Sequence, residues 1–197
     1  MSEYQNENDA RRDILEVGRR LYALGFVAAN DGNISVRVGE NAVWATPTNV
    51  SKGFMTEDML VKLDLNGNVL DGDLAPSSEI KMHLAVYRRN DALRAVVHAH
   101  PPTATAFAVA GKPLPKSLLA ETELLLGEIP VAPFAPIGSR ELADGVAAYC
   151  AEYNGVLMAR HGICAWGVGA IDALWRAERI EFAAKVALQL KMLGWEI

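Results

Sequence analysis

The sequence lacks the features that mark membrane-spanning, nucleic-acid-binding and disulfide-stabilised proteins. Its apolar stretches are too short to cross a bilayer. It has no basic run, and 19 basic against 24 acidic residues argue against a nucleic-acid partner. Its two cysteines, Cys150 and Cys164, are too few for a disulfide framework, so we expect buried thiols. Met1–Asp9 is polar and has no apolar core, so we do not expect a secretory signal. These absences together favour the cytoplasm.

The 197 residues, 51% of them hydrophobic, are enough for a single domain over 1–197 with one substantial core. Alternating apolar segments predict hairpins that pair 34–38 with 41–46 and 60–65 with 69–70. Helical patterns cover 8–25, a segment from Ser77 to Tyr87, 103–110, 139–153 and 170–193. Because several strands are joined by hairpins, we predict an α/β fold with a mixed or mainly antiparallel sheet covered by helices.

Two of the four histidines stand together at the end of a short apolar strand. Side chains alternate across a strand, so His98 and His100 lie on the same face. Two imidazoles on one face can hold a divalent metal ion, or they can be hydrogen-bonded core residues. Pro101-Pro102 ends the strand and can open the next helix.

His161 also follows an apolar strand, so two strands can bring three imidazoles together and leave an open position on the metal. Glu79, placed nearby, can take a proton from the carbon beside a substrate carbonyl. The same glutamate, with the serines before it, is equally explained as the start of a helix. His83, one turn later, is interpreted as structural. The polar loop 46–53 can cradle an anion or can be an ordinary connector.

Six short motifs occur along the chain in a specific order. They are Gly32-Asn33-Ile34-Ser35, Thr46-Pro47-Thr48, Pro76-Ser77-Ser78-Glu79, His98-Ala99-His100, Pro130 to Leu142 and Arg160-His161-Gly162. In this combination the sequence resembles the class II aldolase/adducin family, which includes fuculose-phosphate aldolases and ribulose-phosphate epimerases. The resemblance extends from Leu21 to about Leu190.

The resemblance implies a three-layer sandwich with a central, mainly antiparallel sheet flanked by helices. It also implies a homotetramer with active sites between neighbouring subunits and a phosphorylated sugar as the small-molecule partner. By position, the metal ligands are His98, His100 and His161, with Zn²⁺ as the expected ion and Mn²⁺, Co²⁺ or Fe²⁺ as alternatives. Glu79 matches the acid/base carboxylate. The positions that bind the substrate phosphate in the family are matched by Asn33, Thr48, Ser77 and Ser78. Asn49 belongs to the same set, but it stands where fuculose-phosphate aldolases have glycine.

The expected reaction is cleavage of a phosphorylated ketose to dihydroxyacetone phosphate and an aldehyde through a metal-stabilised enediolate. Fuculose-phosphate aldolase places a catalytic tyrosine from a neighbouring subunit near the position of Leu119, and no tyrosine lies close by here. Glu121 can replace it as an acid/base group, or can form a salt bridge at a subunit contact. Dehydratase, decarboxylase and epimerase reactions therefore compete with aldol cleavage. A non-catalytic module of the adducin type is disfavoured, since the three histidines and Glu79 are all present.

Overall fold

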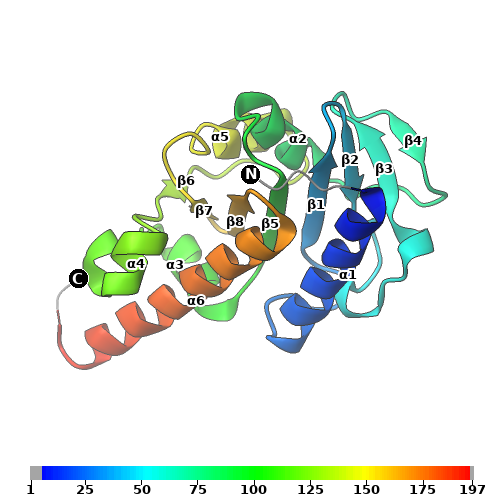
Figure 1. Cartoon of the computed structure of the whole chain (residues 1–197). Helices are drawn as coiled ribbons and strands as arrows, with labels where there is room; N and C mark the ends of the chain where they lie inside the picture. Colours follow the sequence, from blue (N-terminus) through cyan, green and yellow to red (C-terminus); the bar gives the residue numbers. More distant parts are fainter. Residues whose placement is uncertain (1–5, 196–197) are drawn as a thin grey trace.

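The computed structural model describes residues 6–195, and the eight strands within this range form one sheet (Figure 1). The strand order is β4-β3-β2-β1-β5-β8-β7-β6. All neighbouring strands pair antiparallel except β6 and β7, which are parallel. This arrangement confirms the predicted mainly antiparallel sheet. The expectation about a secretory signal partly concerns residues 1–5, which lie outside the described residues.

The strands are β1 (Asn33–Val38), β2 (Ala42–Ala45), β3 (Val61–Asp64), β4 (Val69–Asp71), β5 (Ala95–Ala99), β6 (Val131–Ala132), β7 (Gly155–Met158) and β8 (Gly162–Gly167). The α-helices are α1 (Glu7–Ala23), α2 (Ile80–Arg89), α3 (Pro102–Ala110), α4 (Ala120–Leu125), α5 (Arg140–Ala147) and α6 (Ala170–Met192). The predicted hairpins β1–β2 and β3–β4 both form, with the expected antiparallel pairing.

Helices cover both faces of the sheet, which makes the three layers that the resemblance implied (Figure 1). One core lies under α1, α3 and α6, and it contains Val97 of β5. The other core lies under α2 and α5, and it contains Val96 of the same strand. Neighbouring residues of β5 thus enter opposite cores, as strand alternation requires. His98 shares the face of Val96, which is the face covered by α2.

Two helix boundaries differ from the predictions by more than about two residues, which is the usual uncertainty of a helix end. The helix expected from Ser77 begins at Ile80, because the Glu79 side chain turns into the protein and makes no cap hydrogen bond. The helix expected through 153 ends at Ala147. Beyond it, Tyr149 and Cys150 donate to carbonyls three residues back, and Asn90 Nδ2 donates to the Cys150 carbonyl, so the chain continues as turns.

Both cysteines are free and buried, as the sequence analysis expected. Cys164 lies in β8, whereas Cys150 lies in the turns after α5 and not in a helix. Within residues 6–195, no helix combines the length and the apolar character needed to cross a membrane.

Candidate active site

Strand β5 carries the first histidine into the protein interior. His98 is completely buried and is paired across the sheet with Asn33 of β1. Its Nδ1 lies 2.8 Å from the Ile163 carbonyl oxygen, which can only accept a hydrogen bond. The proton of a neutral His98 therefore sits on Nδ1, and Nε2 presents its lone pair to the site. This is the usual arrangement of a metal-binding histidine, whose second nitrogen donates to a carbonyl or carboxylate.

His100 follows the end of β5 and lies on the same side as His98. The two Nε2 atoms are 3.0 Å apart. On the other side of its ring, His100 Nδ1 lies 3.4 Å from the Asp31 carboxylate. Asp31 therefore orients His100 as the Ile163 carbonyl orients His98, and the sequence analysis missed this role.

His161 lies in the turn between β7 and β8, where Arg160 adopts a left-handed φ of 60°. The residue after His161 is Gly162, and a Cβ at this position would come within 2.5 Å of both the Ala99 carbonyl oxygen and the His100 ring. The close approach of this turn to the end of β5 brings the third imidazole to the other two. The ring centres of the three histidines are 4.7 to 5.2 Å apart.

One nitrogen from each histidine lies within 4.8 Å of the others, a spacing at which the group can hold a metal ion. Three neutral imidazoles are a suitable donor set for zinc and related divalent ions. Only small rotations of the rings are needed, because Zn–N distances of about 2.0–2.1 Å place such nitrogens roughly 3–4 Å apart. The predicted trio of histidines is thus brought together in the folded chain.

Glu79 points into the same site from the residue before α2. Its carboxylate is 3.2 Å from His98 Nε2 through Oε2 and 3.5 Å from His161 Nε2 through Oε1. Asn33 Nδ2 donates a hydrogen bond to Oε2 at 3.0 Å. Oε1 is buried, and none of the described residues forms a hydrogen bond with it. A buried carboxylate oxygen without a partner, facing three imidazoles, fits a site that receives a cation or a substrate proton.

Burial and neighbouring charges shift the pKa values of Glu79, His98 and His161 in different directions. Burial alone would raise the pKa of Glu79, but His98, His161 and the Asn33 amide together hold it well below its usual range. Burial also opposes protonation of His98, but the Glu79 carboxylate raises its pKa overall. Burial, with the neighbouring His98, lowers the pKa of His161 to about 4. An ionised Glu79 is therefore the stable form across neutral pH.

The predicted phosphate-binding loops lie side by side next to Glu79. Thr48 N–H donates to the Ala75 carbonyl, and Ser77 N–H donates to the Thr46 carbonyl. Ser77 is buried and Ser78 is exposed. Asn49 is exposed and has a φ of 59°, a left-handed conformation that glycine and asparagine adopt more readily than other residues. The loop conformation thus accommodates asparagine at this position.

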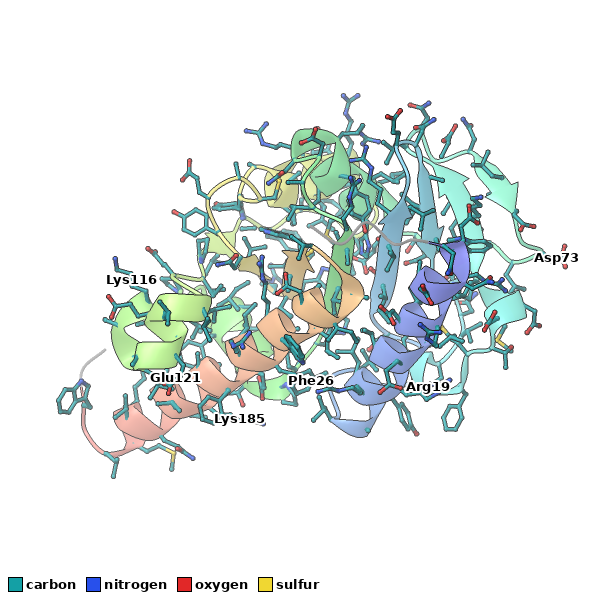
Figure 2. The ribbon with its side chains drawn as sticks, in the orientation of Figure 1. Arg19, Phe26, Asp73, Lys116, Glu121 and Lys185 are labelled. Carbon is teal, nitrogen blue, oxygen red and sulfur yellow. The ribbon has the colours of Figure 1, made fainter. Side chains whose placement is uncertain are left out.

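Glu121 is not brought to the histidines within one chain. It is exposed on α4, and Figure 2 labels its side chain there. Among residues 6–195, no hydrogen bond or ion pair connects Glu121 to the site. A contact of Glu121 with an active site would therefore involve another copy of the chain.

Sequence reasoning also missed two buried charged groups that support the site. Lys52 donates from Nζ to the carbonyls of Asn30 and Val50, which ties the loop that carries Asp31 to the predicted phosphate loop. Glu181 of α6 accepts hydrogen bonds from Thr103 N–H and Ala104 N–H at the start of α3. The sequence gives only a weak signal for either residue, because Lys52 is one charge in a polar loop and Glu181 is one charge in a long helix.

The three-layer fold with a histidine trio beside a glutamate is the arrangement that the resemblance implied, and comparison with known proteins gives the same family. Residues 12–188 match the family model described as the class II aldolase and adducin N-terminal domain. The chain belongs to this family, and it is an enzyme of the class II aldolase kind. Class II aldolases depend on a metal ion.

Three similar proteins narrow the comparison. An L-fuculose phosphate aldolase of Methanococcus maripaludis is 36% identical over 88% of this chain and 93% of its own length. A 3-oxo-tetronate 4-phosphate decarboxylase of Haemophilus influenzae is 31% identical over 90% of this chain and 86% of its own. A solved L-fuculose 1-phosphate aldolase superposes with a TM-score of 0.90 at 31% identity, covering 96% of this chain and 89% of its own.

Proposed function

We propose that the protein is a zinc-dependent aldolase that cleaves a phosphorylated ketose to dihydroxyacetone phosphate and an aldehyde. The observation that carries this proposal is the buried Glu79 Oε1, which forms no hydrogen bond with any of the residues 6–195 and faces three converging imidazoles. His98, His100 and His161 would hold the ion. When bound, the ion supplies Lewis-acid polarisation of the substrate carbonyl and the adjacent hydroxyl oxygen.

The residues of the chain would then divide the remaining work. Glu79 holds or releases the proton at the carbon that loses or forms the C–C bond, because Oε1 is its free acceptor. Asn33, which the resemblance placed among the phosphate ligands, holds the other carboxylate oxygen. The side chains of Thr48, Ser77 and Ser78 bind the phosphate, which places the reacting carbons against Glu79.

The first test is an aldol-cleavage assay on zinc-loaded protein, with L-fuculose 1-phosphate, L-rhamnulose 1-phosphate and deoxypentulose 1-phosphates as substrates. Release of dihydroxyacetone phosphate is the expected result. Glu79→Gln should lose turnover by at least about 100-fold while it retains zinc, because an amide cannot accept the substrate proton. The matched control is Glu152→Gln at an exposed carboxylate, which should keep activity. Full activity of Glu79→Gln, or of zinc-free protein, would overturn the proposal.

Decarboxylation is the second candidate reaction. The Haemophilus influenzae relative favours it, and so does the absence of a tyrosine near Leu119. A decarboxylase would start from the same proton-handling carboxylate and the same ion. Incubation with 3-oxo-tetronate 4-phosphate and measurement of released CO₂ separates the two reactions. CO₂ release without dihydroxyacetone phosphate from any ketose phosphate would replace the aldolase assignment.

We also propose that the enzyme is a cytoplasmic homotetramer in which Glu121 acts in the site of a neighbouring subunit. Its exposed position on α4, with no hydrogen bond or ion pair to the histidines among the described residues, supports this arrangement. Glu79→Gln and Glu121→Ala subunits should each be inactive alone. Random mixing in a cyclic tetramer would restore about a quarter of the sites, because one in four interfaces then has both glutamates. No recovery after subunit exchange would refute a role across the interface.

A further inference from the structure

A continuous chain of hydrogen bonds runs from the hydroxyl of Tyr87 to the carboxylate of Glu79. Tyr87 Oη and Ser35 Oγ are 2.7 Å apart, and Ser35 Oγ is 2.7 Å from His83 Nδ1. His83 Nε2 is 2.6 Å from Asn33 Oδ1, and Asn33 Nδ2 is 3.0 Å from Glu79 Oε2. All five side chains are buried, with exposed fractions of 9% or less. The proposed function uses only the Glu79 end of this chain.

The chain forms because a helix and a strand have matching repeats. Glu79, His83 and Tyr87 are spaced four apart, which places them along one side of α2 at intervals of about 6 Å. Asn33 and Ser35 are spaced two apart on β1, which places them on one face at intervals of roughly 6.6 Å. The two rows therefore stay in register, and each polar group meets a partner on the other element.

The direction of every hydrogen bond follows from the carboxylate. Ionised Glu79 can only accept, so Asn33 presents its amide N–H to it and turns Oδ1 toward His83. An amide oxygen also only accepts, so His83 must carry its proton on Nε2. Nδ1 is then an acceptor, and Ser35 donates its hydroxyl proton to it. Because the Ser35 hydroxyl proton is used in this way, Tyr87 shares its own proton between Ser35 Oγ at 2.7 Å and the Ser35 backbone carbonyl at 3.0 Å.

His83 is suited to one fixed state of this chain. It is 1% exposed, and both of its ring nitrogens have partners. Burial lowers the pKa of His83 to about 3, so the ring stays neutral wherever the enzyme is folded and active. A neutral ring with its proton on Nε2 determines which way the Asn33 amide points. The sequence analysis interpreted His83 as structural, and its bond to Asn33 also connects it to Glu79.

We infer that His83 is a positioning residue that, through Asn33, fixes the orientation of the Glu79 carboxylate with Oε2 held and Oε1 free. The catalytic consequence rests on the proposed role of Glu79 as acid and base. Reversal of the Asn33 amide would place its oxygen against Oε2, and the carboxylate would turn away to avoid the repulsion. The proton-accepting oxygen would then lose its alignment with the substrate carbon.

The first experiment determines the His83 tautomer without any substrate. The chain has four histidines, so ¹⁵N-histidine labelling of the zinc-loaded protein gives a simple long-range ¹H–¹⁵N spectrum. The His83 signals, assigned by their loss in His83→Gln, should show a neutral ring protonated on Nε2 from pH 5 to 8. A ring protonated on Nδ1, or a charged ring, would overturn the inference.

The second experiment uses variants that separate positioning from packing. His83→Met keeps the apolar volume and removes the donor to Asn33, so kcat should fall about 10–100-fold while KM changes little. His83→Gln places an amide N–H near the Nε2 position and should recover most of the lost kcat. Tyr87→Phe is the matched control: it removes a buried hydroxyl from the same row but leaves the Ser35–His83–Asn33 bonds intact. It should lower stability without the loss in kcat.

Equal losses of kcat in His83→Met and Tyr87→Phe would assign the effect to core packing and refute the inference, as would a fully active His83→Met. If the wild-type protein cleaves or decarboxylates no substrate, the proposed function fails, whereas the tautomer spectrum still decides the orientation of Asn33. A His83→Met protein that does not fold leaves the decision to His83→Gln and the tautomer, which test the same bond.

Discussion

Glu181 of α6 caps α3 and accepts a hydrogen bond from the Ala104 amide, 77 residues earlier in the chain. Loss of this cap should destabilise the part of the site that carries His100. Helix α3 starts with Pro101 and Pro102, which have no N–H group and offer no side-chain cap. The first free donors are therefore the amides of Thr103 and Ala104. Glu181 accepts from them at 3.2 and 2.8 Å, and it is 1% exposed.

The expected effect of Glu181→Ala can be worked from these contacts. A hydrogen bond to a charged group contributes about 1.5–3 kcal/mol, and a buried donor left without a partner adds its desolvation penalty. Water can reach the partly exposed Thr103 amide, so one of the two bonds is largely replaced. We expect a loss of about 3 kcal/mol, which for a chain of this size is roughly 6–12 °C in Tm.

The assay is thermal and urea unfolding, followed by circular dichroism at one protein and one zinc concentration. Glu181→Gln keeps one acceptor oxygen and should lie between the wild type and Glu181→Ala. The matched control is Lys185→Ala, which removes the 3.4 Å partner of Glu181 at a position with 56% exposure and should change stability by under about 1 kcal/mol. A Glu181→Ala protein no less stable than Lys185→Ala would refute the reasoning.

Three other predictions concern the loops and the turn around the site. Burial lowers the pKa of Lys52 from 10.5 to about 8, so the unfolded chain binds more protons between these values. The free energy of unfolding should therefore rise with pH in that window by up to about 3 kcal/mol, measured by urea titration. Lys52→Met should lack this rise, and an equal change with pH in both proteins would contradict the prediction. Asn49, at φ 59°, should tolerate glycine within about 1 kcal/mol but lose about 1–2 kcal/mol on replacement by valine, and equal Tm values would argue against left-handed strain. Gly162→Ala should bind less than one zinc per chain by elemental analysis, because the added Cβ meets the His100 ring. The control Gly145→Ala, whose Cβ enters open space, should keep its zinc. Full zinc loading of both variants would show that the turn can shift to accommodate the Cβ.

Much of the fold follows from local rules that a sequence states directly. The alternation of Val96, Val97 and His98 predicted which side chains share a face of β5, and the two cores confirm it. Asn66-Gly67-Asn68 predicted the β3–β4 hairpin because its turn chemistry is local. The resemblance to the family then supplied the layer order, which periodicity alone does not specify.

The supporting residues of the site could not be found in this way, because their partners are distant in the chain. Asp31 is recognisable only once its loop meets the end of β5, and Lys52 only once two loops share its ammonium group. Helix ends were also displaced: α2 begins after Glu79, which was predicted to lie in its first turn and whose side chain instead turns inward to Asn33. The role proposed for Glu121 depends on a contact between two copies of the chain, which neither periodicity nor spacing encodes.

The relay of hydrogen bonds from Tyr87 to Glu79 also explains why one particular oxygen of Glu79 is suited to the proposed proton transfer. If Oε1 receives the proton, Oε2 still accepts from Asn33, and every donor and acceptor back to Ser35 keeps its role. If Oε2 received it, Asn33 would have to turn, and a buried network satisfied in only one direction would be left with an unpaired group. The relay is therefore compatible with repeated proton transfer at Oε1 alone, so the His83 ring should keep its proton on Nε2 throughout turnover.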